Sequence, residues 1–237
     1  MNISYKIKRL KQFGVNVLAN CCDAPVIVLL YHRVGEAKDD YQQLFVSMEN
    51  FEKQIEFLKN NFQVLRFEDD WSQIKKTSFV ITFDDGYSDN LYNALPILKK
   101  HSTPATFFVS SGNILTGDGF WWDRLEYILL NTKIDFNQFN LPISLPDLRT
   151  QAVLQTQLYL KKLSIREREK IIEQLAIDSN PKLERRQQYR PLTIDELKRL
   201  DADPLVTIGS HTVNHPQLSA LPRGEQECEI NTGKVQL

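Results

Sequence analysis

The stretch Ser78-Phe-Val-Ile-Thr-Phe83, followed directly by Asp84-Asp85-Gly86, determines how this chain folds. Its first six residues form a nearly continuous apolar run, which predicts a strand buried on both faces of a parallel sheet. In parallel α/β folds the carboxyl ends of the strands form the binding rim. Two adjacent carboxylates at that rim are costly without a cation or a proton between them, so Asp84 and Asp85 indicate a site. The alternative is ordinary turn chemistry, since Gly86 permits a sharp turn.

Further strands and helices alternate around this stretch. Apolar runs at residues 25–31, 105–109 and 205–208 predict strands, and we expect the first to be buried on both faces as well. An amphipathic helix is predicted over residues 51–62. Another helix surrounds Pro96, which implies a kink or a late start. This alternation predicts βαβ units with right-handed crossovers, and therefore an α/β fold that is half of a closed barrel or one flank of an open sheet.

The later part of the chain changes pattern. Residues 121–200 follow a helical period and contain two capping boxes, Ser164 with Glu167 and Thr193 with Glu196. We therefore expect a helical insertion over about 121–200. It would lie within one domain over residues 25–237, after an N-terminal basic and amphipathic segment over residues 1–24.

The composition is that of a globular protein without a nucleic-acid-binding face. The chain has 237 residues, 42% of them hydrophobic, which is enough for a sizeable core. Its 29 Lys and Arg residues against 30 Asp and Glu residues give a net charge of −1, whereas a general nucleic-acid binder needs a basic face. The cysteines Cys21, Cys22 and Cys228 have no zinc-ligand spacing. We expect no nucleic-acid partner and no disulfide framework, which suits a reducing compartment.

The N-terminal segment is a poor signal peptide. It begins with basic residues, and its apolar part is short and broken by Asn16 and Asn20. No run approaches the roughly 20 apolar residues of a membrane span. An amphipathic surface helix is the alternative, with peripheral membrane contact. We expect a cytoplasmic or membrane-peripheral protein, and the sequence leaves the oligomeric state open.

His211 and His215 form the second candidate site. Spaced at i and i+4, they would share one face of a helical turn that starts at Ser210, so that both imidazoles reach one ion. The alternative is a pair of loop histidines without a metal. One aspartate and two histidines with open coordination positions describe a catalytic metal site. The second aspartate could take a proton from the water that such an ion activates. A phosphoesterase is disfavoured, because the sequence has no phosphate-binding Gly-rich loop.

Several stretches resemble the polysaccharide deacetylases, the NodB-homology domain of carbohydrate esterase family 4. The segment Thr82-Phe-Asp-Asp-Gly-Tyr87 is similar to their first motif, and Ser210-His-Thr-Val-Asn-His215 is similar to their second. Three more stretches resemble members with a helical insertion: Tyr31-His-Arg-Val34, Thr103-Pro-Ala-Thr-Phe-Phe-Val109 and Trp121-Trp-Asp123. The resemblance runs from about residue 25 to residue 236, with the motifs in the family's order.

This resemblance implies a fold and a reaction. The fold would be a distorted, incomplete (β/α) barrel of the NodB-homology type. The reaction would be a metal-dependent hydrolysis in which activated water attacks an acetyl carbonyl and frees the amine of an N-acetylhexosamine unit in a polysaccharide or oligosaccharide. By resemblance, Asp84 is the general base. Asp85, His211 and His215 bind the divalent metal, usually zinc, and an acetylated glycan is the partner.

The chain departs from the family pattern after His215. The later family motifs, including the one that supplies the catalytic acid, are missing, so we expect a C-terminally truncated member. The alternative function is therefore a non-catalytic homologue that retains metal or glycan binding. His32 is a candidate replacement acid, with a packing role as the favoured alternative. Trp121 and Trp122 are candidates for stacking on a sugar or for anchoring the core, and Tyr87 is a candidate for lining the cleft.

Overall fold

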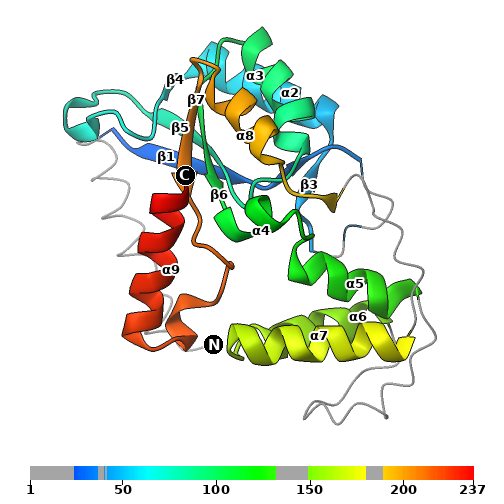
Figure 1. The fold of residues 1–237 in the computed structure, drawn as a ribbon. Helices are drawn as coiled ribbons and strands as arrows, with labels where there is room; N and C mark the ends of the chain where they lie inside the picture. Colours follow the sequence, from blue (N-terminus) through cyan, green and yellow to red (C-terminus); the bar gives the residue numbers. More distant parts are fainter. Residues whose placement is uncertain (1–23, 37–39, 41, 132–148, 180–188) are drawn as a thin grey trace, which may run out of the picture.

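The computed structural model describes residues 24–36, 40, 42–131, 149–179 and 189–237, and it is built around one parallel sheet (Figure 1). Its path is β1-β5-β6-β7, and β4 pairs with the first half of β5. All pairings in this sheet are parallel. Its strands are β1 (Val26–Tyr31), β4 (Gln63–Leu65), β5 (Ser78–Phe83), β6 (Ala105–Val109) and β7 (Val206–Ser210). Within the described residues the sheet is open, so the α/β prediction with an incomplete barrel is confirmed.

The register of the sheet brings the strand ends to one rim. Tyr31 pairs with Phe83, and Phe83 pairs with Phe107. At the other side Val109 pairs with Ser210. Because parallel strands in this register end together, the residues that follow β1, β5, β6 and β7 all emerge on the same edge of the sheet. A small parallel ladder of β2 (Arg33–Val34) and β3 (Phe45–Val46) continues from the end of β1.

Three helices cover one face of the sheet. They are α2 (Met48–Asn61), α3 (Leu95–Lys100) and α8 (Ile194–Asp201), which lie together beside the strands in Figure 1. Their apolar stripes bury Ile55, Leu98 and Leu200 against Phe83 and Phe107. The sequence leaves open a kink or a late start at Pro96. A π-helix, η2 (Asn90–Ala94), runs directly into α3, and Pro96 lies in the first turn of α3, so the change from π-helix to α-helix occurs next to the proline.

A second core lies in the predicted insertion. Helices α5 (Trp121–Asn131), α6 (Arg149–Leu160) and α7 (Ile165–Ser179) pack together around Leu125, Val153 and Leu175. Helix α8 also falls within the predicted insertion range, but it packs into the first core beside the sheet. The second core is therefore built by α5 to α7.

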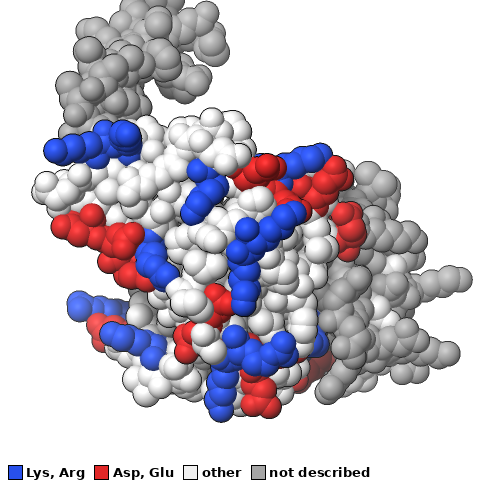
Figure 2. Space-filling view, turned by 90° about the horizontal axis from the view of Figure 1, so that it is seen from above, with Lys and Arg blue, Asp and Glu red and all other residues white. Residues whose placement is uncertain are grey.

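The remaining elements lie around the sheet. The helix α4 (Ser111–Thr116) follows β6, and α9 (Arg223–Gln236) follows β7. The described residues also include two 3-10 turns, η1 (Trp71–Gln73) and η5 (Leu218–Ala220). Acidic and basic side chains are interspersed on the face shown in Figure 2. The one described cysteine, Cys228, is free and exposed.

Strand β1 corrects one prediction. It is not buried on both faces, because Val28 is 44% exposed and Leu30 is 54% exposed. Among the described residues β1 pairs with β5 alone, so it is an edge strand there. An apolar run predicts a fully buried strand only where the strand has a neighbouring strand on each side and a layer of packed elements on each face of the sheet.

The N-terminal prediction is almost entirely untested by the structure. Residues 1–23 lie outside the described part of the chain, and so do Cys21 and Cys22. Among the helices that are described, none has the length and apolar content required to cross a bilayer.

Glu196 joins the start of α8 to two neighbouring segments. It forms the predicted capping box with Thr193. Its carboxylate accepts hydrogen bonds from Arg190 Nη1 and Nη2, at 2.6 and 2.8 Å, and from the Tyr92 hydroxyl at 2.6 Å. These bonds, those from Arg190 first, lower the pKa of Glu196 to about 2. The ionised carboxylate therefore stabilises the folded chain.

We expect Glu196→Gln to lower the free energy of unfolding by about 1–3 kcal/mol at pH 7, because hydrogen bonds to a charged acceptor are lost. The folded pKa of Glu196 lies below its ordinary value of 4.5. The stability that the ionised Glu196 contributes is therefore complete above pH 4.5 and is lost as the pH falls toward 2. Urea unfolding at pH 7 and at pH 3 measures this, with exposed Glu173→Gln as the control. An equal loss at both pH values would contradict the assignment.

Candidate active site

The turn after β5 aims two carboxylates at the rim. The Asp84 N–H donates to the Tyr31 carbonyl at 2.9 Å, which continues the pairing of β5 with β1 for one residue. Asp85 and Gly86 then take left-handed backbone angles, with φ of 73° and 89°. This abrupt reversal is sterically unfavourable for Asp85, and such positions are concentrated at functional sites. The turn places Asp84 and Asp85 at the edge where the strand ends meet.

The histidine loop after β7 differs from its prediction. Ser210 is the last residue of β7 rather than a helix cap, and residues 211–215 form no helical turn. Thr212 and His215 instead adopt left-handed φ angles of 66° and 49°. The Thr212 hydroxyl accepts a hydrogen bond from the His215 N–H at 3.1 Å, which closes the loop. The two imidazoles still lie side by side, with ring centroids 4.6 Å apart.

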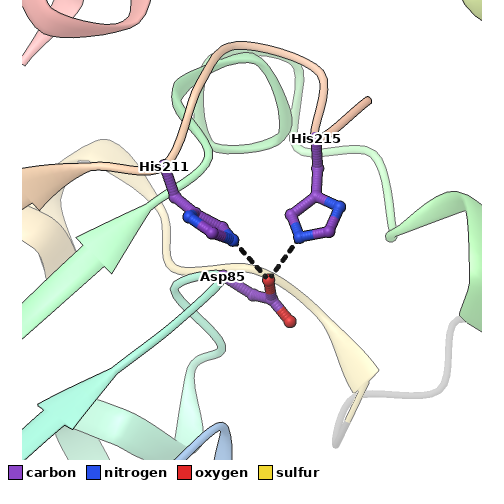
Figure 3. A group of neighbouring side chains, drawn as sticks. All are labelled: Asp85, His211 and His215. Atoms are coloured by element: carbon purple, nitrogen blue, oxygen red, sulfur yellow. Dashed lines mark ion pairs between the residues drawn. The ribbon is translucent and has the colours of Figure 1, made fainter. Parts of the chain in front are cut away.

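Asp85, His211 and His215 converge on one point (Figure 3). Asp85 Oδ1 lies 3.3 Å from His215 Nε2 and 3.7 Å from His211 Nε2. One potential ligand atom from each of the three residues lies within 4.8 Å of the other two. The Asp85 side chain is 3% exposed, while both imidazoles are about one-third exposed on the outer side. The three residues predicted from the sequence therefore form one cluster.

The donor atoms fit a divalent ion. Asp85 Oδ1 is buried and has no hydrogen-bond partner, although two imidazole nitrogens lie nearby. Bonds of about 2.0–2.2 Å in a tetrahedral zinc site place two ligand atoms about 3.4 Å apart. The two distances from Asp85 Oδ1 lie close to that value. An unsatisfied buried oxygen at this spacing is better explained by a cation position than by hydrogen bonding.

The electrostatics agree with that fit. Burial, followed by the charges of Asp84 and Asp123, raises the pKa of Asp85 well above its usual value. Burial lowers the pKa of His211, and burial followed by His211 lowers the pKa of His215 to about 3. The imidazoles are therefore neutral at ordinary pH, which is the form that binds metals. The raised pKa means that the ionised carboxylate is unfavourable here without compensation, and a bound cation would supply that compensation.

Asp84 and His32 lie beside this cluster. Asp84 Oδ2 is 3.9 Å from His211 Nε2, and the Asp84 side chain is 17% exposed. Burial raises the pKa of Asp84, and His32 pulls it back down. Burial lowers the pKa of His32, against the opposite effect of Asp84. Asp84 is outside the ligand group but faces its edge, and His32 is close enough to interact electrostatically with both Asp84 and His211.

The aromatic candidates lie in the interior. Tyr87 is fully buried, Trp121 is 4% exposed and Trp122 is 5% exposed, so none offers an open ring face to a sugar or to a cleft. The Tyr87 hydroxyl donates to Asp123 Oδ2 at 2.7 Å and accepts from Trp122 Nε1 at 2.8 Å. The Trp122 ring lies 4.7 Å from the His215 ring. The core-anchor alternative therefore fits the tryptophans, and Trp122 joins the second core to the histidine loop.

Sequence reasoning missed a buried ion pair beneath the site. Arg33 Nε and Nη2 donate to Asp89 Oδ2 at 3.0 and 2.9 Å, and the guanidinium lies 4.0 Å from the ring centroid of Tyr87. Asp89 Oδ1 accepts from the Val34 N–H at 3.1 Å. Because Asn90 also donates to the His32 carbonyl at 2.9 Å, the η2 segment holds the chain just after β1. Arg33 lies in the Tyr31–Val34 stretch that resembles the deacetylases, but its role depends on Asp89, which is 56 residues away.

A cleft extends from the histidines along β7. Its volume is about 950 Å³, and it lies between α8 and α9. Leu197, Ile208 and Ile230 line it together with Lys198 and Lys234. The exposed side of the cluster therefore opens toward a space large enough for a small ligand.

We expect Gly86→Ala to lower the free energy of unfolding by about 3 kcal/mol. A Cβ at this position would lie 2.8 Å from Val109 Cγ1, and the left-handed φ of 89° adds backbone strain. Urea unfolding measures the loss.

Gly117→Ala is the matched control. Gly117 has a φ of 71°, but a Cβ there would meet no atom within 4 Å. Its loss should be only about 1 kcal/mol, from strain alone. Equal losses for the two variants would contradict the tight packing proposed for Gly86.

Parts of the chain are similar in sequence to known proteins. The sequence profile described as polysaccharide deacetylase matches residues 72–137. The Bacillus subtilis protein YxkH, named for the same family, is 35% identical over 38% of this chain and 34% of its own length. The poly-beta-1,6-N-acetyl-D-glucosamine N-deacetylase of Staphylococcus aureus is 32% identical over 37% of each chain. Both matches thus cover about one-third of these relatives.

A solved structure shares the fold. The Streptococcus pyogenes deacetylase PplD, in complex with acetate, superposes with a TM-score of 0.53 and 18% sequence identity. The match covers 89% of this chain and 66% of PplD. Over the matched segments the chain is similar in sequence to polysaccharide deacetylases, in line with the resemblance of its motifs, and it shares the fold of PplD.

Proposed function

We propose that this chain carries the metal site of a hydrolase that removes acetyl groups from N-acetylhexosamine units of a polysaccharide or oligosaccharide. The observation that carries the proposal is the convergence of Asp85, His211 and His215, with an unpartnered buried oxygen at the centre. The sequence match to a protein named as a poly-beta-1,6-N-acetyl-D-glucosamine N-deacetylase supports the substrate class.

Asp85, His211 and His215 would hold the ion, and their one oxygen and two nitrogen donors suit zinc. When bound, such an ion polarises a carbonyl oxygen and lowers the pKa of water. The strained turn at Asp85 and the closed loop before His215 keep the three donors in place before any ligand arrives. This preorganisation reduces the entropy lost on binding.

Asp84 acts as the general base. Its carboxylate is close to His211 but outside the ligand group, and part of it reaches solvent. A base must be unprotonated and near the water that attacks the acetyl carbon. Burial raises its pKa toward the working range, which increases its proton affinity. Asp84 therefore takes the proton that the attacking water loses.

For the general acid we propose His32 rather than a packing role for it, because it is the described histidine beside Asp84 that is outside the ligand group. Burial lowers its pKa, so it would donate its proton only below its ordinary range. When the C–N bond of the acetamide breaks, the leaving nitrogen needs a proton, and the products are acetate and a free amine. His32 follows β1 on the same rim and interacts electrostatically with Asp84. The hydrogen bond from Asn90 to its carbonyl fixes its backbone. A base and an acid that lie near each other at the rim suit a reaction with two proton transfers.

We also propose that residues 25–237 form one domain with α5 to α7 as an insertion. The two hydrophobic cores support this division, because one is built on the sheet and the other on these three helices.

The chain should bind one Zn²⁺ ion, and calorimetry on chelator-treated protein measures it. Asp85→Asn and His215→Ala should each weaken binding by on the order of 100-fold or more, because each removes a ligand. Affinity should fall as the pH falls, since the ligands must be unprotonated and the pKa of Asp85 is raised. His101→Ala is the control, because His101 lies by Glu52 at the end of α3. Unchanged binding in both ligand variants would refute the site.

Acetate release from acetylated glucosamine oligomers should require Asp84 and His32. Asp84→Asn and His32→Gln should each slow it by about 100-fold or more, with His101→Gln unchanged. Activity should rise with pH as Asp84 loses its proton and fall at higher pH as His32 loses its proton; because the pKa of Asp84 is raised and that of His32 is lowered, this window is narrow and its upper limb lies below pH 6.5. In the plot of activity against pH, Asp84→Asn should remove the rise at low pH, and His32→Gln should remove the fall at higher pH. Equal rates in wild type and Asp84→Asn would exclude the base role. Zinc binding without any acetate release would instead support the alternative of a non-catalytic metal-binding or glycan-binding chain.

A further inference from the structure

We propose that Glu229 of α9 is the positioning residue for the histidine loop, and that α9 thereby sets the geometry of the ion site. This inference rests on the proposed function for the identity of the ion. Glu229 lies in a helix that follows the second histidine by eight residues, and its side chain is nearly buried. It does not belong to the group of ligands. It acts through the backbone of the loop that carries them.

The Glu229 carboxylate binds three donors of the loop. Oε2 accepts from the Val213 N–H at 3.0 Å and from the Asn214 N–H at 2.9 Å. Oε1 accepts from Asn214 Nδ2 at 2.7 Å. Charge-assisted hydrogen bonds to backbone N–H groups are shorter and stronger than neutral ones. A single carboxylate thus fixes two successive peptide groups midway between His211 and His215.

The loop needs such a restraint. Thr212 and His215 both hold left-handed φ angles, which cost on the order of 1–2 kcal/mol for each residue with a side chain. Strained conformations persist only where the surroundings determine them. Without Glu229, the N–H groups of Val213 and Asn214 would lose their acceptor at a partly buried position. The loop could then relax toward ordinary backbone angles and separate the two imidazoles.

Other contacts hold the opposite side of the loop. The Ser111 N–H donates to the Thr212 carbonyl at 3.2 Å, and the Gly112 N–H donates to the Val213 carbonyl at 2.9 Å. Arg168 Nη2 of α7 donates to the Asn214 carbonyl at 3.3 Å. These groups supply donors for the carbonyls, whereas Glu229 supplies the acceptor for the N–H groups. The loop is therefore fixed between α9 and the rest of the domain.

Gly233 allows α9 to come close enough. It lies one helical turn after Glu229, on the same face of the helix. A Cβ at Gly233 would lie 2.7 Å from Ser210 Oγ and 2.9 Å from the Thr212 carbonyl carbon. The Ser210 hydroxyl could rotate away, but the Thr212 backbone could not move without shifting the loop. Glu229 and Gly233 together fit one face of α9 to the end of β7 and its loop.

The experiment measures amide hydrogen exchange at residues 212–215 in the metal-free chain, together with the dissociation constant for Zn²⁺. Glu229→Ala should speed exchange at Val213 and Asn214 at least tenfold and weaken Zn²⁺ binding by about 10–100-fold, the usual cost of losing a group that orients a ligand. Glu229→Gln should keep most of the protection from exchange and most of the Zn²⁺ affinity, because its amide oxygen can still accept from the N–H groups of Val213 and Asn214. Glu227→Ala is the control, because Glu227 is exposed on the same helix and pairs with Arg223.

A second pair of variants keeps the test decisive if Glu229→Ala fails to fold. Gly233→Ala should loosen the loop in the same way by pushing α9 outward. Gly224→Ala, also in α9, should change nothing, because no atom lies within 4 Å of its added Cβ. Unchanged loop exchange in the Glu229 and Gly233 variants would overturn the proposal, whether or not the chain binds zinc. Failure of the wild-type chain to bind Zn²⁺ would instead count against the proposed function.

Discussion

One buried carboxylate imposes the main constraint on this molecule. Asp85 lies at the end of the central strand with an oxygen that has no hydrogen-bond partner. Leaving such a group uncompensated costs several kcal/mol, so the surroundings must either neutralise it or offer it a cation. The fold provides two neutral imidazoles within 3.7 Å and no fixed positive charge in the group. The buried oxygen is therefore compensated either by a proton, which the raised pKa of Asp85 favours, or by the cation that we propose for this site.

The parallel sheet brings the histidines close to Asp85. Strands that end in register deliver residues from distant parts of the sequence to one edge without any special connection. The last adjustments are then made by a few residues with left-handed backbone angles, at Asp85, Thr212 and His215. The rigid sheet determines where these residues lie, and the short strained turns determine where their side chains point.

Much of this could be predicted from the sequence, because it depends on local pattern. The strands at 78–83 and 105–109, the capping box at Thr193 and the ligand trio are all visible as runs or spacings. The shape of the histidine loop was not predictable, since the i, i+4 spacing suits a helix and only tertiary hydrogen bonds select the left-handed form. The exposure of β1 and the burial of Trp122 depend on what packs beside them. Arg168 and Glu229 gave no signal, because each acts on a segment far away in the chain.

His215 lies at the junction between the two cores. The Trp122 ring of α5 touches its imidazole, and Arg168 of α7 holds the neighbouring carbonyl. Helical units of this size can open locally at less than the cost of global unfolding. If the proposed ion binds, it and the docked helices would favour the same loop conformation, so by thermodynamic linkage each would strengthen the other. Local opening of α5 to α7 would then become rarer when the proposed ion is bound, although these helices contribute none of the three clustered side chains.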